Sequence, residues 1–333
     1  MGLTYEKAGV KVKESDEFKR ELTSMVSETM RPEVLSDMSA FCSLFSFPRG
    51  FEEAVIASAT DGVGSKCLLA ESFGKLPCLG QDVVAICVND LITVGAAPLF
   101  FLDYIATEHF ERSSVEALVR SIAKACREAG CALVGGDTAQ MPGVYASGHF
   151  DLAGFVVGAV ERSKILGAHR VRAGDQVLGL PSSGLHSDGF SLVRAILGSE
   201  DANEIRKIDV DFSLEEELLR PTRLYVKEME AIRSLDGVHA AAHITGGGIA
   251  RNVSRILPPG HSAVLDKGQW EVPKVFDWLS QRGDVEEEEM FRTFNMGIGF
   301  VVLAAYEAVD NLVEAGFSLI GSVQGGAGEV KIQ

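Results

Sequence analysis

Short apolar runs alternate along the chain with stretches in which apolar residues recur at helical spacing. The apolar runs predict strands at 55–59, 99–105, 131–134, 152–160, 176–180, 298–304 and 318–323. The helical spacing predicts helices at 82–95, 113–129, 188–197, 214–234, 251–257, 274–281 and 306–315. Strands and helices that alternate in this way are typical of sheets covered by helices.

The helix at 113–129 has the strongest pattern. Ser113-x-x-Glu116 is typical of a capping box, and Gly130 is typical of a helix C-terminus. One stripe of apolar residues runs along it, comprising Val115, Leu118, Val119, Ile122, Cys126 and Ala129. The stripe gives the predicted helix one apolar face.

The turn around Gly167–Gly174 divides the pattern into two parts. With 333 residues, 46% of them hydrophobic, the chain is long enough for two domains with cores of ordinary size. We therefore predict an α+β fold with an N-terminal domain at 1–166 and a C-terminal domain at 167–333.

The charge and the cysteines exclude several classes of function. A formal net charge of −16 disfavours binding to nucleic acid or to an anionic membrane. All six cysteines lie within the first 131 residues and form no C-x-x-C pair, which favours reduced thiols over zinc or disulfides. The polar N-terminal segment and the absence of a long apolar run indicate a cytoplasmic protein.

Five segments combine glycines with acids, hydroxyls or histidines. They are T-D-G-V-G-S-K (60–66), C-V-N-D-L (87–91), G-G-D-T-A-Q-M-P-G (135–143), S-S-G-L-H-S-D-G (182–189) and H-I-T-G-G-G (243–248). Mg²⁺ prefers carboxylates together with phosphate oxygens, and glycine-rich turns expose N–H groups to phosphate. The set indicates a site for a magnesium-bound nucleotide.

Each segment also has a purely structural interpretation. Asp61 and Asp137 are equally typical of turn caps, and a lone His186 or His243 is more often a satisfied core histidine. Asp90 lies on an otherwise apolar helix and therefore needs a partner, either a metal or a buried Lys or Arg. Gly246–Gly248 fits a loop that needs positive φ, and the four acids from 286 to 289 fit a solvated face.

Taken together and in order, these segments resemble the phosphoribosylformylglycinamidine cyclo-ligase (aminoimidazole ribonucleotide synthetase) family. The resemblance covers nearly the whole chain. It also includes L-T-Y-E-K-A-G-V (3–10), R-P-E-V (31–34), G-A-A-P-L-F-F-L-D-Y-I-A-T (95–107), P-T-R-L-Y-V-K (221–227) and E-M-F-R-T-F-N-M-G-I-G (289–299). No single segment is specific, but the ordered set is.

The resemblance implies an enzyme of purine biosynthesis. It would use ATP and Mg²⁺ to close the ring of formylglycinamidine ribonucleotide, giving aminoimidazole ribonucleotide, ADP and phosphate through an iminophosphate. It also implies a homodimer that pairs the N-terminal sheets through the strands near 99–105 and 152–160, and a C-terminal domain with a mixed sheet and helices that completes the cleft.

The resemblance assigns roles to matching residues. Asp61, Asp90 and Asp137 would hold Mg²⁺ against ATP, and His186 would transfer a proton or bond the phosphoryl or formyl oxygen. Lys66 would offset phosphate charge. The remaining ATP- and phosphate-binding candidates are Thr60, Gly62, Gly64, Asn89, Gly135, Gly136, Thr138, Ser183, Gly184, Ser187, His243, Thr245, Gly246, Gly247 and Gly248.

Three positions depart from the family pattern. Asp137 and Gln140 stand where Glu is common, and Lys11-Val12-Lys13 replaces an acidic stretch near the nucleotide site. Two alternatives stay open: a thiamine monophosphate kinase-like enzyme, and a non-catalytic nucleotide-binding protein. Selenophosphate synthetase is disfavoured because the first cysteine is Cys42, and the larger synthetase of the preceding pathway step requires a much longer chain.

Overall fold

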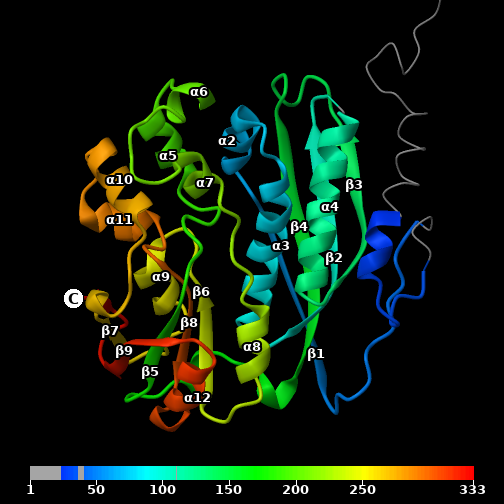
Figure 1. Cartoon of the computed structure of the whole chain (residues 1–333). Helices are drawn as coiled ribbons and strands as arrows, with labels where there is room; N and C mark the ends of the chain where they lie inside the picture. The colour runs from blue at the N-terminus through cyan, green and yellow to red at the C-terminus, as the bar shows by residue number, and fades with distance from the viewer. Residues whose placement is uncertain (1–23, 37–40, 110) are drawn as a thin grey trace, which may run out of the picture.

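Two β-sheets, one in each half of the chain, form the frame of the molecule (Figure 1). The computed structural model describes residues 24–36, 41–109 and 111–333. The segments 3–10 and 11–13 quoted above therefore lie outside the described residues. Helix α3 stands between the N-terminal sheet and the C-terminal domain in Figure 1.

The N-terminal sheet has four strands in the order β1-β4-β2-β3. Its strands are β1 (Ala54–Gly62), β2 (Ala97–Thr107), β3 (Ala132–Gln140) and β4 (Phe150–Glu161). Its principal helices are α2 (Lys66–Phe73), α3 (Pro77–Ile92) and α4 (Arg112–Glu128). A Cβ at Gly154 would lie 2.3 Å from the Phe101 ring, and one at Gly158 would lie 2.6 Å from Leu91 Cδ2, so these glycines permit close packing on the helical side.

The opposite face of this sheet is open. Ile56 on β1, Tyr104 on β2 and Phe155 on β4 are 66%, 39% and 37% exposed. All three side chains lie on the face away from α3, because their neighbours in each strand are the ones that pack in the core.

The C-terminal sheet has six strands in the order β10-β7-β9-β5-β8-β6 and mixes parallel and antiparallel pairs. Its strands are β5 (Gln176–Pro181), β6 (Val238–His243), β7 (His261–Leu265), β8 (Ile298–Ala304), β9 (Ser318–Gly325) and β10 (Val330–Ile332). Its helices are α5 (Phe190–Leu197), α6 (Ala202–Ile205), α7 (Leu214–Leu219), α8 (Val226–Ile232), α9 (Gly248–Ser254), α10 (Lys274–Gly283), α11 (Glu287–Thr293) and α12 (Val309–Glu314).

Strand β8 is buried along its whole length because both faces of this sheet are covered. Phe300 and Val302 pack in the larger hydrophobic cluster, and Val301 and Leu303 pack in a second cluster on the other face. The larger cluster also contains the apolar residues of α3, so one core continues from the N-terminal helices to the C-terminal sheet.

The structure corrects several details of the predicted elements. Helix α4 begins at Arg112, and Ser113 donates its hydroxyl to Glu111 Oε1, so the predicted capping box does not form. The region 214–234 contains two short helices, because Pro221 interrupts it. Strands β6, β7 and β10 and helices α2, α6 and α11 were not predicted.

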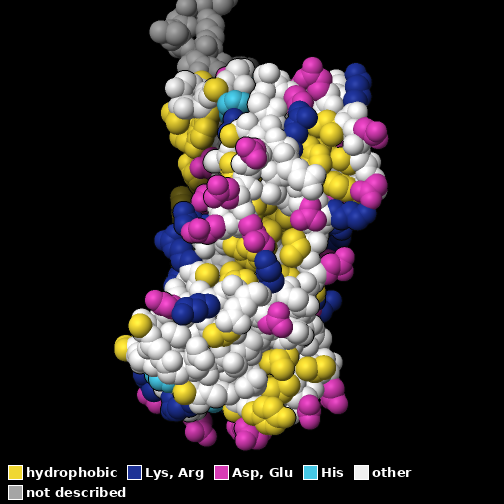
Figure 2. All heavy atoms as spheres, turned by 90° about the vertical axis from the view of Figure 1, so that its left-hand side faces the viewer, with side chains coloured by type: hydrophobic (Ala, Val, Ile, Leu, Met, Phe, Trp, Pro, Cys, Tyr) yellow, Lys and Arg dark blue, Asp and Glu magenta, His cyan; other side chains and the backbone are white. Residues whose placement is uncertain are grey.

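The α+β two-domain fold is confirmed, including the mixed C-terminal sheet with helices. The boundary at 166/167 stays a prediction. Among the described residues, no helix is long and apolar enough to cross a membrane. The face shown in Figure 2 carries interspersed acidic and basic side chains, with hydrophobic side chains in several separate groups.

Candidate active site

Three carboxylates from different elements approach one another where the two domains meet. Asp61 lies near the end of β1, Asp90 lies on α3, and Asp188 lies in the loop between β5 and α5. Asp61 accepts a hydrogen bond from the N–H of Gly62 (2.7 Å), and Asp188 accepts one from the N–H of Gly246 (2.8 Å). We call Asp61, Asp90 and Asp188 the acidic corner.

The carboxylates of the acidic corner act on one another electrostatically. Partial burial raises the pKa of Asp61, and the charge of Asp90 raises it further. Burial raises the pKa of Asp188 to about 6, and the charges of Asp61 and Asp90 add to the rise, whereas the hydrogen bond from the Gly246 N–H opposes it. Carboxylates that repel one another in this way are suited to a cation.

His243 connects the acidic corner to the interior of the protein. Its Nδ1 lies 2.9 Å from Asp90 Oδ1, and its Nε2 lies 3.4 Å from Asn89 Nδ2. Since Asn89 Nδ2 can only donate, these contacts fit a neutral imidazole with its hydrogen on Nδ1. The side chain of His243 is 1% exposed, whereas that of Asp90 is 44% exposed. The partner that Asp90 required is thus a histidine, not a buried Lys or Arg.

His186 is fully buried behind this corner, and its backbone is left-handed at φ 62°. Its Nε2 accepts the N–H of Ser183 (3.3 Å), and Nδ1 has no partner among the described residues. Burial holds the pKa of His186 well below its usual range, and the positive charge of the nearby Lys66 acts in the same direction. Gly299 leaves the necessary space, since a Cβ there would lie 2.5 Å from His186 Cε1.

Lys66 lies elsewhere than the sequence suggested. Its side chain is fully buried, and its Nζ lies 2.8 Å from Asp82 Oδ2. The same ammonium donates to the carbonyl oxygens of His186 and Arg220, both at 2.9 Å. Direct contact between Lys66 and phosphate does not fit this geometry.

The structure does not bring Asp137 to the acidic corner within one chain. The register across the sheet runs Asp61–Gly154–Asp103–Gly136, so β1 and β3 are opposite edges, about 14 Å apart. The side chain of Asp137 also lies on the open face, beside Tyr104, because Gly136 points toward Asp103 on the helical side. Gly135 and Gly136 thus belong to a strand, and the predicted glycine-rich turn is wrong there.

Several of the proposed nucleotide contacts bind other parts of the protein. The hydroxyl of Thr60 donates to Gly154 O (2.8 Å), and the hydroxyl of Ser183 donates to Pro221 O (2.7 Å). The hydroxyls of Ser187 and Thr222 lie 3.2 Å apart. The Asn89 side chain bonds the backbone of Arg223 and Tyr225. Thr138 lies in β3, paired with Ile105 in β2.

Half of the candidate glycines have a left-handed backbone, whereas Gly62, Gly135, Gly136 and Gly246 do not. Gly64, Gly184, Gly247 and Gly248 all have positive φ. A Cβ at Gly248 would lie 1.8 Å from the carbonyl oxygen of Phe291, so this position excludes any side chain. The carbonyl oxygen of Thr245 accepts the N–H of Gly248 (3.1 Å), which closes the turn before α9.

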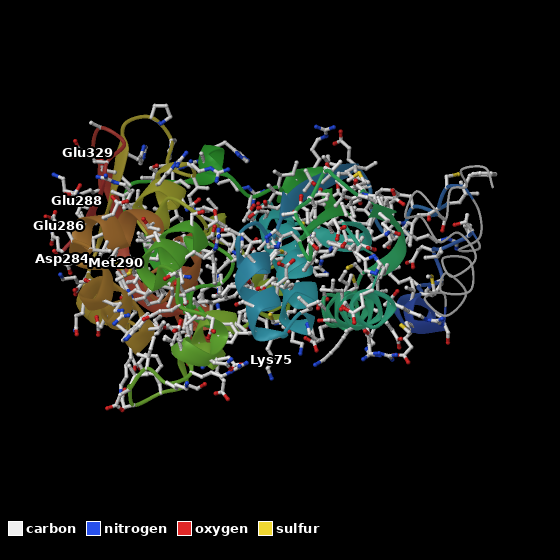
Figure 3. All side chains as sticks on the ribbon, turned by 90° about the horizontal axis from the view of Figure 1, so that it is seen from above. Lys75, Asp284, Glu286, Glu288, Met290 and Glu329 are labelled. Carbon is white, nitrogen blue, oxygen red and sulfur yellow. The ribbon has the colours of Figure 1, made fainter. Side chains whose placement is uncertain are left out.

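A cavity of about 910 Å³ opens beside the Gly246–Gly247 turn. Three cations line it, and two of them are paired: Lys267 with Glu287, and Arg292 with two acids of α11. The guanidinium of Arg251 forms no ion pair or hydrogen bond with the residues that the structure describes. The predicted solvated acids form the start of α11, where Glu286 and Glu288 project outward (Figure 3).

Comparison with known proteins gives the family. Residues 48–160 match the N-terminal domain, and residues 172–332 the C-terminal domain, of AIR synthase related protein. The chain belongs to the AIR synthase family. A phosphoribosylformylglycinamidine cyclo-ligase of Sorangium cellulosum (strain So ce56) is 47% identical to this AIR synthase-family chain over 319 residues, which cover 95% of this chain and 92% of the relative.

Solved structures of other proteins share the fold of this AIR synthase-family chain. Thiamine-monophosphate kinase from Stenotrophomonas maltophilia K279a has a TM-score of 0.70 at 20% identity, covering 94% of this chain and 95% of that one. The hydrogenase maturation protein HypE in complex with ATP has a TM-score of 0.66 at 17% identity, covering 94% and 90%. At these identities the likeness concerns the fold alone.

Asp188 is a candidate site residue that the sequence analysis did not name. It lies two positions after His186 and directly before the Gly189 that precedes α5, inside a segment already singled out. The signal was therefore present, but only the packing of the two domains shows that this acid faces Asp61 and Asp90.

Among the described residues, no three His, Cys, Asp or Glu side chains are placed to ligate one ion together.

Proposed function

We propose that this AIR synthase-family chain catalyses the ATP-dependent cyclisation of formylglycinamidine ribonucleotide to aminoimidazole ribonucleotide, in the cytoplasm. The observation that carries the proposal is the 47% identity, over nearly the whole chain, to a relative named for this ligase activity. The acidic corner supports the proposal, because carboxylates beside a cavity can bind the Mg²⁺ that accompanies ATP in phosphoryl transfer.

The acidic corner suits Mg²⁺ carried in with ATP. Mg²⁺ is usually held by one or two carboxylates together with substrate phosphates and water. We infer that Asp61 and Asp90 provide the direct ligands and that Asp188 acts beside them. The three carboxylates are close enough to affect one another's pKa, so together they make this part of the cleft negative. When bound, Mg²⁺ would neutralise charge on the transferring phosphoryl group.

The two histidines would act as neutral hydrogen-bonding groups that orient other site residues or the substrate, rather than as imidazolium cations that donate a proton. His243 donates from Nδ1 to Asp90 and so fixes the direction of that carboxylate. His186 is neutral and buried, with an unpartnered Nδ1. We infer that His186 acts by hydrogen bonding near the formyl or phosphoryl oxygen after the substrate-bound cleft rearranges. This choice follows from its lowered pKa.

The cavity beside Gly246–Gly247 is the place we propose for the ribose phosphate of the substrate. Its volume of about 910 Å³ falls in the range of small-molecule sites. Arg251 offers a guanidinium that is not already paired within the described chain. In this arrangement the formylglycinamidine end would extend past Gly189 toward the acidic corner.

We further propose that the enzyme is a homodimer paired through the open face of the N-terminal sheet. The exposed Ile56, Tyr104 and Phe155 would be covered in that pairing. Asp137 lies on the same face, so a second copy would determine its surroundings. The departure at Asp137 thus concerns this face rather than the acidic corner of a single chain.

An ADP-release assay tests the proposed function. The protein is incubated with ATP and Mg²⁺, with or without formylglycinamidine ribonucleotide, and aminoimidazole ribonucleotide is followed colorimetrically in parallel. We expect ADP and product in equal amounts, and only when the ribonucleotide is present. ATP binding without ribonucleotide-dependent ADP would contradict the proposal and favour a non-catalytic nucleotide-binding protein.

Thiamine monophosphate is the matched alternative substrate, because a kinase acting on it shares the fold. We expect no ADP release when it replaces formylglycinamidine ribonucleotide. ADP release with thiamine monophosphate alone would assign the chain to the kinase reaction instead.

A further inference from the structure

The loop between α7 and α8 belongs to the C-terminal domain and runs along the junction with the N-terminal domain, almost without regular structure. In residues 220–225 (R-P-T-R-L-Y), backbone groups are bonded by side chains of the N-terminal domain. Lys66 bonds Arg220 O, Gln81 bonds Thr222 O (2.9 Å), and Asp82 Oδ1 accepts both the N–H and the hydroxyl of Thr222 (2.7 and 2.6 Å). Thr222 is fully buried, so its backbone and hydroxyl groups require such partners because water does not reach them.

Lys66 occupies the centre of this bonding pattern. An ammonium has three N–H donors. The Lys66 ammonium donates to Arg220 O and His186 O and lies 2.8 Å from Asp82 Oδ2 as an ion pair, and its complete burial keeps ligands from reaching it. Both charged side chains are fully buried, and the Phe190 ring of α5 covers the ammonium at 5.4 Å from its centroid.

The hydrogen bond from Lys66 to the carbonyl oxygen of His186 helps to fix the loop that carries Asp188, two residues further along the chain. His186 holds a left-handed backbone, which is costly for a residue with a side chain. The same turn carries Asp188 to Asp61, and Asp61 lies only five residues before Lys66 on the other segment. One buried cation therefore fastens together the two loops that contribute Asp61 and Asp188.

We propose that Lys66 is a positioning residue that, with Asp82, aligns the 182–189 loop so that Asp188 completes the acidic corner. The inference deepens the proposed function and rests on it. It also reassigns Lys66, since a phosphate ligand would need a free N–H group. Substitution of Lys66 should therefore lower kcat and weaken activation by Mg²⁺. It should change the apparent affinity for ATP at saturating Mg²⁺ only slightly.

Four variants test this role. K66M removes the cation, and K66M/D82L removes both buried charges together, because an Asp82 carboxylate left alone would be uncompensated. T222V removes the hydrogen bond from the Thr222 hydroxyl to Asp82 Oδ1 and keeps both buried charges. K75M is the control, since Lys75 is exposed and takes no part in the buried Lys66–Asp82 ion pair.

The measurements are kcat, KM for ATP, the Mg²⁺ activation constant and the melting temperature, together with NMR of labelled histidines. In K66M/D82L we expect at least a tenfold loss of kcat, at least a fivefold rise of the activation constant and less than a threefold change in KM for ATP. The double variant should recover melting temperature relative to K66M without recovering kcat. T222V should change in the same direction to a smaller extent, and K75M should match the wild type.

The histidine signals separate this proposal from the proposed function. The NMR resonances of His186 and His243 should shift in K66M/D82L whether or not the wild type has cyclo-ligase activity. Absence of cyclo-ligase turnover in the wild type would contradict the proposed function but not the positioning role of Lys66. Unchanged signals, or wild-type kcat and Mg²⁺ response in the double variant, would overturn the positioning role. So would a tenfold rise of KM for ATP with unchanged kcat, which would establish a phosphate contact.

Discussion

Asp90 Oδ1 and His243 Nδ1 lie 2.9 Å apart and join helix α3 of the N-terminal domain to the end of strand β6 in the C-terminal domain. The imidazole is buried, whereas the carboxylate is 44% exposed. The carboxylate therefore has one oxygen fixed by the protein and retains capacity to bind a ligand from the solvent side. A metal ligand held in this way is oriented before the metal arrives.

We expect Asp90→Asn to reduce kcat/KM at least 100-fold, while changing the melting temperature by no more than about 2 °C. The amide oxygen still accepts from His243, so the fold keeps its bond and loses only the charge that Mg²⁺ needs. The measurement is steady-state ADP release across a Mg²⁺ titration, alongside thermal unfolding. Near-wild-type turnover at saturating Mg²⁺ would show that Asp90 is not a metal ligand.

Asp188→Asn separates stability from activity. The amide oxygen of the variant can still accept the hydrogen bond from the Gly246 N–H. The substitution removes a negative charge that Asp61 and Asp90 repel. We expect the Mg²⁺-free protein to gain about 1 kcal/mol of unfolding free energy, and the Mg²⁺ activation constant to rise about tenfold.

The control for this pair of measurements is Asp284→Asn. Asp284 is exposed at the far end of the C-terminal domain (Figure 3), and Asn tolerates its left-handed backbone. That variant should match the wild type in both measurements. If D188N left the Mg²⁺ response unchanged, Asp188 would not belong to the metal site.

Much of the fold could be predicted from apolar spacing, because strands such as β8 and helices such as α4 bury continuous or striped apolar surface. The Gly135–Gly136 strand could not, since the local sequence is typical of a turn. Close approach to Asp103 is what requires glycine there. Strand β6 has small residues (V-H-A-A-A-H) and thus a weak strand pattern.

The site was predicted in part for a related reason. Asp61, Asp90 and His243 stand in segments whose composition indicates chemistry, and the structure brings them together. Lys66 and Asp137 stand in similar segments, yet one is sealed in a buried ion pair and the other lies on the opposite edge and face of the sheet. Composition does not show which way a side chain points; that depends on register and domain packing.

Acid should destabilise the protein partly through His186. Burial keeps its pKa in the folded state well below the unfolded value of about 6.5, so below that pH the unfolded chain binds a proton that the native chain does not. The stability from neutral His186 is thus present above pH 6.5 and is lost as pH falls from there toward the lower folded pKa.

The measurement is urea unfolding of the wild type and His186→Leu between pH 8 and pH 5. We expect the wild type to lose up to about 1.4 kcal/mol per pH unit more than H186L over the acidic part of this range. His169→Gln, which removes an exposed histidine, should keep the wild-type slope. Parallel curves for wild type and H186L would contradict the assignment.

His186 also has a role to test in the reaction. We expect His186→Ala to keep nucleotide binding within about threefold and to lower ring closure at least 100-fold, because the buried imidazole lies behind the corner rather than against the phosphates. Calorimetric titration with a non-hydrolysable ATP analogue measures binding, and aminoimidazole ribonucleotide formation measures closure. Loss of nucleotide binding in a folded variant would make His186 a nucleotide contact instead.

The open face of the N-terminal sheet gives the last prediction, which concerns assembly. Ile56→Asp places a charge at a side chain that is 66% exposed in the single chain, so the fold of the chain should tolerate it. If two copies pair through this face, the same charge would be buried without a partner, and a dimer should dissociate. Val313→Asp, at a 50% exposed apolar residue on α12, is the matched control and should stay dimeric. Light scattering after gel filtration measures the mass of each species. A dimeric I56D, a monomeric wild type, or dissociation of V313D would each show that the chain does not pair through this face.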